Sequence, residues 1–574
     1  MADPFYYEKL VILNQVYHNT LIPCNYEEHS IDGIETRLFP HQQTMVQRMH
    51  EYHERMMRGI MIKNQAIHAK VGIIADPIAS GKSLSILSYL ASYRRKDKQT
   101  IACELSPYST RYFYSHDIYH LSDRPTVHLI IVPHYLFQEW RNEIQKHTTL
   151  KYVAIETRRL LRDEELSKNM IESSFVITTN KCYKYVHEYA QQHDIQWDQI
   201  FVDEASSIYM NSSDPPLQFQ FLWLITNQWI PLLFKNASFH RASLYHLKDQ
   251  VTLTPSLHPD LESWLAHTHS SHYDGCLTSS GFFKDYLSFY HSSRYVMVLR
   301  NSEEWVRSHL QLPLPMINTV YCRPNISLHS LMSYYLSRHL EPIIHSNKIP
   351  HLFQSLGVTF QPAEEYCSQN PPQKHGLIRR NVEDNECVVC LEHAEYPTMV
   401  DCCYHLYCGK CLLKSVLMNG KCPTCRDHVQ PSRMTCFSQL LPEQQLNTKN
   451  KSEICLDFIR NCRTGRFIIY SAFDNIYYQL FEEIDRIGLK AERIEGNLFS
   501  LLKSIRNFKQ GTTQILFISN MDLIRGISFP LATHLIFYHD QPSYERKQLL
   551  IHSAQRVGRT QALQIVQLHS EIQV

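Results

Sequence analysis

Residues 71–90 of the chain read VGIIADPIASGKSLSILSYL. The apolar run Val71–Ala75 predicts a buried strand, and the spacing of leucine and isoleucine after residue 83 predicts a helix. The loop between them ends in Gly81, Lys82 and Ser83. Backbone N–H groups at the start of such a helix attract anions, so the segment predicts a phosphate site. In that site Lys82 reaches the terminal phosphates and the Ser83 hydroxyl ligates Mg²⁺.

The same loop departs from the usual phosphate-loop pattern G-x4-G-K-[ST], because Asp76 stands where the first glycine is expected. A Gly-Lys-Ser sequence also occurs by chance at helix starts, so a second motif is needed. One lies farther along the chain, where an apolar strand ends in Asp203 and Glu204. In phosphoryl transfer Asp203 would hold Mg²⁺ through water and Glu204 would polarise the attacking water. The alternative for this pair is a solvated turn.

Several segments resemble, in order, the motifs of superfamily 2 helicases, and those of their SNF2-like branch in particular. That branch has Asp-Glu-Met-Gly-Leu-Gly-Lys-Thr in its phosphate loop, which accounts for Asp76. Leu38–Gln42 is similar to its adenine-reading segment, which implies that Gln42 contacts the base. Two further segments are Leu129–Pro133 with Trp140, which resembles motif Ia, and Phe175–Asn180, which resembles the next strand and its nucleic-acid contact.

The C-terminal part of the chain resembles the second lobe of these helicases. Arginines of the last motif cross the cleft to the transferring phosphoryl group and stabilise its developing charge. The resemblance implies that Arg559 is the arginine finger and Arg556 its companion; the alternative is a basic helix face in solvent. The matching segments are Arg466–Ser471 for motif IV, Gln514–Ser519 and Arg525–Phe529 for motif V, and Gln555–Arg559 for motif VI.

Between residues 387 and 425, cysteines and one histidine follow the pattern C-x2-C, C-x-H-x2-C-x2-C, C-x2-C. Zinc takes four tetrahedral ligands from Cys and His, so eight ligands predict two sites. The alternatives are free buried cysteines or a disulfide framework, but the ligands are in register and paired rather than dispersed. Because protein fills every coordination position, this zinc is a scaffold and not a catalyst. The predicted ligands are Cys387, Cys390, Cys403, His405, Cys408, Cys411, Cys422 and Cys425.

The cysteine pattern resembles the RING finger, in which the first and third ligand pairs hold one ion and the second and fourth pairs the other. Cys402 also precedes His405, but the one-residue gap to the histidine favours Cys403. RING domains commonly recruit a ubiquitin-conjugating enzyme, and the contact positions of the family hold Val388, Pro423 and Arg426 here. The resemblance therefore implies one zinc on Cys387, Cys390, Cys408 and Cys411, and another on Cys403, His405, Cys422 and Cys425.

The charge of the chain is balanced, with 57 Lys and Arg against 56 Asp and Glu and a formal net charge of +1. This balance argues against a highly basic tail, so we expect nucleic acid to bind in a local groove. The apolar segment Phe221–Phe234 is short and is interrupted by Asn227 and Gln228, so we expect no membrane span. We also find no secretory leader, and we expect an intracellular location such as the nucleus or a viral factory.

These motifs together predict an α/β protein with two recA-like parallel-sheet lobes and a small two-zinc RING domain inserted between them. That order resembles the RING-bearing SNF2 proteins of post-replication repair, and the divergence of the motifs resembles helicase-like proteins of large DNA viruses. A helical pattern runs from Ser327 to Ile344. The expected domains are an N-terminal extension at 1–29, an ATP-binding lobe at 30–240, a helical insert and linker at 241–380, the RING at 381–430 and a C-terminal lobe at 431–574.

This organisation predicts an ATPase that uses ATP and Mg²⁺, translocates along nucleic acid, DNA rather than RNA, and presents a RING for ubiquitin transfer. The alternative is a nucleotide-gated clamp that hydrolyses ATP poorly and recruits partners through its RING. The altered motif III motivates the clamp, and a second departure follows Asp203 and Glu204. Ser206 replaces the usual histidine after Asp-Glu-Ala, and Leu224–Asn227 replaces the Thr-Gly-Thr-Pro of motif III. Motif III couples hydrolysis to movement, so coupling is more in question than hydrolysis.

Overall fold

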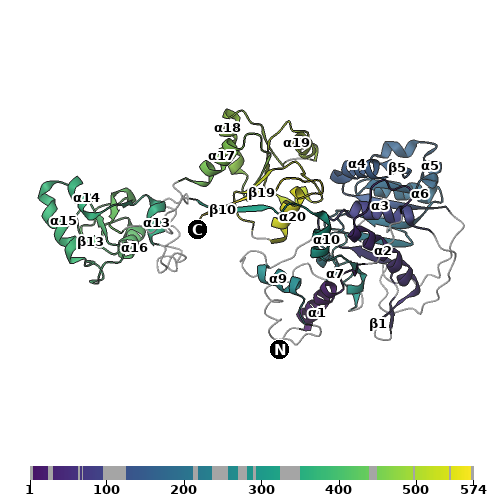
Figure 1. Ribbon diagram of the computed structural model, residues 1–574, viewed down its shortest axis with the longest axis horizontal. Coiled ribbons are helices and arrows are strands. Elements are labelled where there is room, and N and C mark those ends of the chain that lie inside the picture. Colours follow the sequence, from purple (N-terminus) through teal and green to yellow (C-terminus); the bar gives the residue numbers. More distant parts are fainter. Residues whose placement is uncertain are drawn as a thin grey trace.

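Two large parallel sheets and a separate zinc-finger module make up the protein, which is described by a computed structural model (Figure 1). This arrangement confirms the predicted fold class. The described residues are 4–23, 30–62, 65–67, 69–94, 125–210, 217–234, 256–268, 281–288, 293–322, 349–438, 449–495, 498–541 and 544–570.

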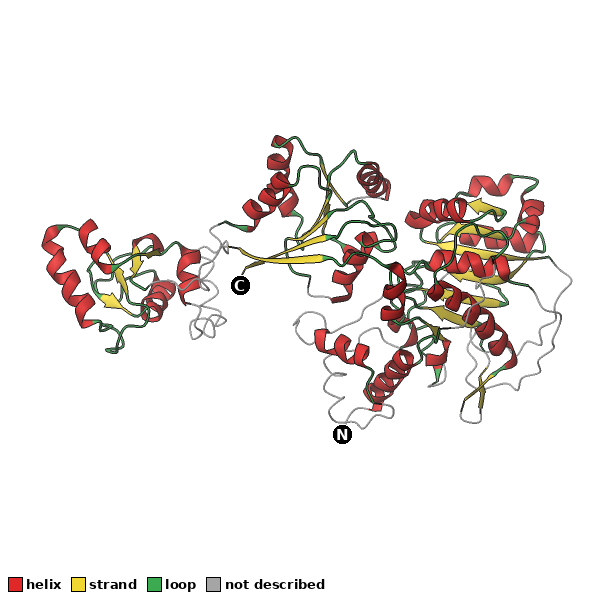
Figure 2. Cartoon of the chain, viewed as in Figure 1, coloured by secondary structure: helices red, strands yellow, loops and turns green. Residues whose placement is uncertain are grey.

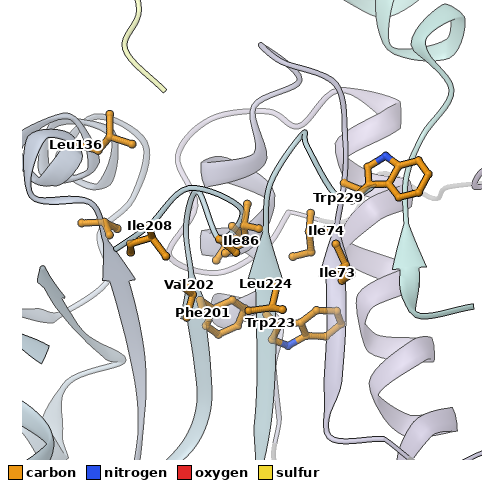
Figure 3. Packing of buried hydrophobic residues seen from close by; sticks show 14 of the residues in the cluster. Ile73, Ile74, Ile86, Leu136, Phe201, Val202, Ile208, Trp223, Leu224 and Trp229 are labelled. Atoms are coloured by element: carbon orange, nitrogen blue, oxygen red, sulfur yellow. The ribbon is translucent and has the colours of Figure 1, made fainter. Parts of the chain in front are cut away.

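The first lobe is built on a seven-stranded sheet. Its strands are β3 (Val71–Ile74), β4 (Thr126–Val132), β5 (Tyr152–Ile155), β6 (Phe175–Thr179), β7 (Gln196–Val202), β8 (Phe221–Ile225) and β9 (Val298–Leu299). They lie in the order β5-β6-β4-β7-β8-β3-β9, and every neighbouring pair is parallel. The central strands β3, β6 and β8 are buried along their whole length, because a covered parallel sheet has no solvent face. Figure 3 shows Phe201, Trp223 and Leu224 beside Ile73 and Ile86 in this core.

Helices surround the first sheet (Figure 2). They are α1 (Pro4–His18), α2 (Pro40–Arg58), α3 (Lys82–Ser92), α4 (Phe137–His147), α5 (Leu166–Glu172), α6 (Tyr183–Gln192), α7 (Ile230–Leu233), α9 (Pro259–Thr268) and α10 (Glu303–Leu310). Short 3-10 turns occupy His134–Leu136, Arg158–Arg162 and Arg294–Met297, and the antiparallel pair β1 (Ile60–Ile62) and β2 (Gln65–Ile67) forms a separate hairpin. The predicted helix of the phosphate loop is α3, which starts directly after Gly81.

The second lobe is built on a six-stranded sheet. Its strands are β10 (Met316–Cys322), β15 (Phe467–Tyr470), β16 (Ala491–Arg493), β17 (Ile515–Ile518), β18 (His534–Phe537) and β19 (Gln564–Ser570). They lie in the order β10-β19-β18-β15-β17-β16 and are again all parallel. The helices of this lobe are α17 (Lys451–Asn461), α18 (Asn475–Arg486), α19 (Leu498–Gln510) and α20 (Tyr544–Ala554), with a 3-10 turn at Met521–Ile524.

The zinc-finger module lies on the far side of the second lobe from the first lobe (Figure 1). Its helices are α13 (Ile349–Leu356), α14 (Ala363–Gln369), α15 (Pro372–Asp384) and α16 (Gly409–Asn419). Its strands are β11 (Thr359–Phe360), β12 (Thr398–Val400), β13 (Leu406–Tyr407) and β14 (Met434–Cys436), in the order β11-β14-β12-β13, and a 3-10 turn lies at Pro431–Arg433. The module has a hydrophobic core of its own, in which Phe353, Ile378 and Leu412 are buried.

The elements extend across several of the expected domain boundaries. β9 lies beyond residue 240 and yet pairs with β3, and β10 lies in the expected insert and yet pairs with β19. α1 packs on the first lobe, where its residues Leu10 and Leu13 join the main core. The zinc module runs from α13 through β14, which is wider than 381–430. A two-residue strand carries no readable periodicity, and β10 is mostly exposed, so the sequence pattern did not mark either strand.

Two further expectations concern helices. The helical pattern from Ser327 to Ile344 lies outside the described residues. Within the described ranges, no helix combines the length and the apolar character that crossing a bilayer requires.

Candidate nucleotide site and zinc centres

The phosphate loop joins β3 to α3 through two residues with left-handed backbone. Gly81 has φ 81° and caps α3, and a Cβ at this position would collide with the side-chain amide of Gln42. Gln42 accepts a hydrogen bond from Phe39 N at 2.9 Å and donates one to Ser80 O at 3.2 Å. Ala79 has φ 69°, a conformation that costs a residue with a side chain about 1–2 kcal/mol. The loop therefore keeps the backbone shape of a glycine-rich loop, although Ala79 stands where the SNF2-like loop has its first glycine.

Asp76 is a buried carboxylate that faces the protein and not the pocket. It accepts hydrogen bonds from the backbone N of Asn301 at 2.7 Å and from Asn301 Nδ2 at 2.9 Å. Burial raises the pKa of Asp76, and the Asn301 hydrogen bonds oppose that rise. Asp76 was predicted as a nucleotide-binding residue, but it does not line the cavity described below. Its contacts tie the phosphate loop to the segment that leads from β9 into α10.

Lys82, Asp203 and Glu204 lie together at the carboxyl ends of β3 and β7. Lys82 Nζ donates to the carbonyls of Asp76 at 3.1 Å and Pro77 at 3.0 Å. Burial lowers the pKa of Lys82, while the nearby carboxylates of Glu204, Asp76 and Asp203 oppose the shift. Burial, and then the neighbouring Asp203, raise the pKa of Glu204 to about 7. The three charged groups are therefore close enough to perturb one another's protonation, as expected at a reactive site.

The carboxylate of Asp203 is held by two N–H groups, one on each oxygen. Trp140 Nε1, from α4, donates to Oδ2 at 2.7 Å, and the backbone N of Glu204 donates to Oδ1 at 2.9 Å. The sequence predicted Trp140 only as part of motif Ia and gave no sign of this contact. A long-range contact between an indole and a carboxylate leaves no local pattern in the sequence.

A cavity of about 400 Å³ opens between the two lobes. The second lobe approaches closely here: a Cβ on Gly526 would lie 2.6 Å from Leu136 Cδ1 and 3.4 Å from Glu204 Oε1. Lys509 pairs with Glu139, and Arg525 donates to Gln228, so polar contacts also join the lobes. The residues lining the cavity include Gln42, Gly81, Lys82, Ser83, Trp140, Asp203, Glu204, Asn227, Gly526, Ser528 and Arg556.

The two predicted arginines occupy different places. Arg556 lines the cavity, where burial lowers its pKa and the carboxylates of Glu139, Glu143 and Glu204 oppose that shift. Arg559 does not line the cavity, and its guanidinium donates to backbone carbonyls of the second lobe. The structure thus brings Arg556, and not Arg559, to the residues of the first lobe. Arg559 holds the chain after α20 against the loop before β18, because its acceptors are Pro530, Ala532 and Ala554.

The zinc module contains two sets of four thiols, each with its sulfur atoms within 4.8 Å of one another. The Cys390 and Cys408 sulfurs are 3.7 Å apart, and the Cys403 and Cys422 sulfurs are 3.6 Å apart. A zinc tetrahedron with Zn–S bonds of about 2.3 Å has edges of about 3.8 Å, so both sets fit zinc. The first set is Cys387, Cys390, Cys408 and Cys411, as predicted; the second is Cys402, Cys403, Cys422 and Cys425.

The second set of thiols includes Cys402, which the sequence argument had left spare. The sequence argument named His405 and left Cys402 spare, whereas the structure places the Cys402 sulfur 3.8 Å from that of Cys403 and leaves His405 outside the set. The spacing rule compares positions along the chain, but the turn at Asp401–Cys403, followed by Tyr404 with φ 59°, brings both adjacent thiols to the same site. His405 Nδ1 is buried and has no hydrogen-bond partner among the described residues.

The residues expected to contact a ubiquitin-conjugating enzyme lie at the surface of the zinc module. Val388 is 41% exposed, Leu391 beside it is 72% exposed, and Arg426 is also exposed, with φ 62°. Pro423 is partly buried between the last two cysteines. Val388, Leu391 and Arg426 are therefore accessible to solvent.

The domain composition follows from comparison with known protein families. The SNF2-related domain matches residues 41–223, which hold the phosphate loop and the Asp203–Glu204 pair, and the C3HC4-type zinc finger (RING finger) matches residues 387–425. The chain contains an SNF2-related domain and a RING finger. The sequence motifs had predicted both of these domains.

Several known proteins are similar to parts of this chain. "Putative helicase R592" of Acanthamoeba polyphaga mimivirus is 26% identical over 204 residues, which are 32% of this chain and 24% of that protein. Helicase-like transcription factor of Oryctolagus cuniculus is 19% identical over 195 residues, 30% of this chain and 19% of that protein. The human E3 ubiquitin-protein ligase RNF138 is 33% identical over 82 residues, 14% of this chain and 30% of that protein. The matched segments thus span less than a third of each relative.

The solved structures include one broad but weak similarity. The helicase domain of Pyrococcus furiosus Hef aligns with 88% of this chain and 92% of that chain, at 12% identity and a TM-score of 0.36. At this TM-score the alignment adds nothing to the fold, which rests on the two parallel strand orders.

Proposed function

We propose that this SNF2–RING protein is an ATPase that moves along nucleic acid, DNA rather than RNA, and that its RING acts as a ubiquitin ligase. One observation carries the first part. Lys82 and Glu204 from the first lobe and Arg556 from the second line one cavity, whose volume of about 400 Å³ lies in the range of small-molecule sites. Groups that bind phosphate, orient water and neutralise charge are what phosphoryl transfer requires.

The charged residues of the cavity divide the work of hydrolysis. Lys82 exchanges its contacts with the carbonyls of Asp76 and Pro77 for the terminal phosphates. Glu204 orients the attacking water, and Arg556 stabilises the charge that develops on the transferring group. Ser83 and Asp203 offer hard oxygen ligands, which suit Mg²⁺, and that ion would neutralise phosphate charge. The proposed role of Arg556 differs from the sequence expectation, in which Arg559 was the finger.

Coupling to movement is proposed to run through the residues that depart from the family pattern. Ser206 Oγ lies 2.8 Å from Thr226 Oγ1, and Thr226 Oγ1 accepts from Gln228 N at 3.0 Å. Gln228 in turn accepts from Arg525 of the second lobe. A continuous route therefore joins the segment that follows Glu204 to the second lobe, although the histidine after Asp-Glu-Ala and the sequence of motif III are replaced. This route favours the motor over the nucleotide-gated clamp.

The nucleic-acid track is proposed to cross the carboxyl ends of β5 and β6. The segments after these strands present four exposed basic side chains, those of Arg158, Arg159, Arg162 and Lys181, among the exposed acidic side chains of Glu156, Asp163, Glu164 and Glu165. Exposed Lys and Arg bind phosphates irrespective of sequence, with an affinity that falls as salt rises. Such a local patch is compatible with the net charge of only +1.

The test is the rate of ATP hydrolysis by the full chain with double-stranded DNA, single-stranded DNA, RNA or no nucleic acid. The proposal expects stimulation by duplex DNA and loss of hydrolysis in Lys82→Ala with an unchanged melting temperature. Tight ATP binding without turnover would support the clamp instead. Hydrolysis by Lys82→Ala at the parental rate would overturn the assignment of the site.

The ligase activity rests on a separate observation, the exposed Val388 and Arg426 beside the zinc centres. RING domains contact ubiquitin-conjugating enzymes through apolar and basic side chains at these positions, and the resemblance implies the same role for Val388 and Arg426. In a reconstituted reaction, Val388→Ala and Arg426→Ala should each reduce ubiquitin chain formation, while ATP hydrolysis stays unchanged. Unchanged chain formation in both variants would leave the RING a structural role.

A further inference from the structure

A tryptophan from a neighbouring helix contacts the carboxylate that faces the phosphate loop. Trp140 lies in α4 and is only 3% exposed, and its indole Nε1 donates to Asp203 Oδ2 at 2.7 Å. An indole N–H is a donor and never an acceptor, and the hydrogen bond it donates is stronger to a carboxylate than to the neutral acid. The contact therefore favours the charged carboxylate, which is the form that binds a cation.

The second oxygen of Asp203 is also fixed. Oδ1 accepts from the backbone N of Glu204 at 2.9 Å. Since each carboxylate oxygen offers about two acceptor sites, each keeps one site for another partner. Both Asp203 and Ser83 line the cavity, so the remaining sites can serve a Mg²⁺ ion held directly or through water. Two N–H groups on different elements thus set the plane of the carboxylate before any ion arrives.

We propose that Trp140 is a positioning residue that orients Asp203 and so sets how tightly the cavity holds Mg²⁺, an inference that rests on the proposed ATPase function. Groups that hydrogen-bond to a metal-ligating side chain typically contribute about 10- to 100-fold to metal affinity.

The helix that carries Trp140 and the turn before it also contact the second lobe and the loop after β6. Glu139, its neighbour in the chain, pairs with Lys509 of the second lobe. The 3-10 turn before α4 is tied to the loop after β6, because the backbone N of His134 donates to Asn180 Oδ1 at 3.0 Å. The helix α4 and the turn before it therefore contact Asp203, the second lobe and the loop after β6 that the sequence predicted to bind nucleic acid. A shift of α4 would move the indole N–H of Trp140 relative to the carboxylate of Asp203.

The experiment compares the full chain with Trp140→Phe, which keeps an aromatic ring and removes the N–H donor. Trp197→Phe is the matched control, since Trp197 is 2% exposed in the same lobe and donates its indole N–H to His187 Nδ1 at 2.9 Å, outside the cavity lining. Two quantities are measured for each protein: the Mg²⁺ concentration at half-maximal ATP hydrolysis, and the affinity for Mn²⁺ with a non-hydrolysable ATP analogue by electron paramagnetic resonance. Melting temperatures report on folding.

The proposal expects Trp140→Phe to raise the half-maximal Mg²⁺ concentration and the Mn²⁺ dissociation constant by about 10-fold or more. Trp197→Phe should change neither, even if it lowers the melting temperature. Parental values of both metal constants in Trp140→Phe would overturn the proposal. If Trp140→Phe does not fold, replacement of Trp140 by benzothienylalanine, which keeps the bicyclic shape without the N–H, gives the same two outcomes.

The proposed ATPase function and the role of Trp140 can fail separately. A parent protein without Mg²⁺-dependent hydrolysis would remove the ATPase assignment. The Mn²⁺ affinities of the parent and of Trp140→Phe, measured without turnover, would still decide whether Trp140 positions Asp203.

Discussion

The hydroxyl of Ser206 lies 2.8 Å from the hydroxyl of Thr226, and both side chains are buried. Ser206 stands where SNF2-like proteins have a histidine after Asp-Glu-Ala, and Thr226 lies in the divergent motif III. The direct hydrogen bond joins the two segments that the sequence alone left doubtful. Two departures from the family pattern therefore fit each other in space.

Ser206→Ala should weaken the coupling between nucleic-acid binding and hydrolysis. The change leaves the Thr226 hydroxyl without its buried partner on the Glu204 segment, and coupling energies between sites are typically about 1–3 kcal/mol. We therefore expect the stimulation of ATP hydrolysis by duplex DNA to fall about 5-fold or more. Thr226→Val should have the same effect, and the double variant should be no worse than either single one. Additive losses would show that the two hydroxyls act independently.

Glu204 should make the stability of the nucleotide-free protein depend on pH. Its pKa is about 7, above the ordinary value of 4.5, because burial and the nearby Asp203 disfavour the charged carboxylate. The positive charges of Lys82, Arg525 and Arg556 oppose this rise of the pKa only in part. Between these values the folded state holds a proton that the unfolded state has lost, so this residue's contribution to stability falls as pH rises from 4.5 to 7.

The measurement is the melting temperature of Glu204→Gln and of the parent from pH 4.5 to 7. The glutamine variant should gain stability relative to the parent as pH rises, and its ATP hydrolysis should be lost at every pH. A constant difference between the two melting temperatures across this range would contradict the account of Glu204.

Ala79→Gly should stabilise the protein. Ala79 has φ 69°, and relief of about 1–2 kcal/mol of strain exceeds the entropic cost of about 0.5–1 kcal/mol for a glycine. A rise of about 1–3 °C in melting temperature is expected for the first lobe. The control is Ala190→Gly in the last turn of α6, where Ala190 is buried, and this change should lower stability by about 1 kcal/mol. A lower melting temperature for Ala79→Gly would indicate that the positive φ is not strained.

The second zinc site should be a four-thiolate site. The sulfurs of Cys402 and Cys403 lie 3.8 Å apart, and His405 is outside the set. With Co²⁺ in place of zinc, Cys402→Ser should lower the sulfur-to-metal charge-transfer absorption and weaken one of two metal sites, whereas His405→Ala should leave the spectrum unchanged. The opposite pattern would restore His405 as the ligand.

The local motifs could be predicted from the sequence because each one is written in a few adjacent residues. Gly81-Lys82-Ser83, Asp203-Glu204 and the cysteine pairs carry their geometry in short spacings, and alternating apolar strands and helices indicate parallel sheets. Contacts between distant segments could not be predicted in this way. Asp76 binds Asn301, 225 positions away, and Trp140 binds Asp203 across the first lobe. Nothing in either local pattern specifies such a partner.

The most direct test of the central claim, that the two lobes form one nucleotide site, is the rate of DNA-stimulated ATP hydrolysis by Arg556→Ala and Arg559→Ala. Arg556 lines the cavity and Arg559 binds carbonyls of its own lobe. An arginine that stabilises the transferring phosphoryl group is worth about 10³- to 10⁵-fold in kcat. We expect a loss of that size in Arg556→Ala with ATP binding retained, and a smaller loss in Arg559→Ala. Hydrolysis by Arg556→Ala at the parental rate would contradict the shared site.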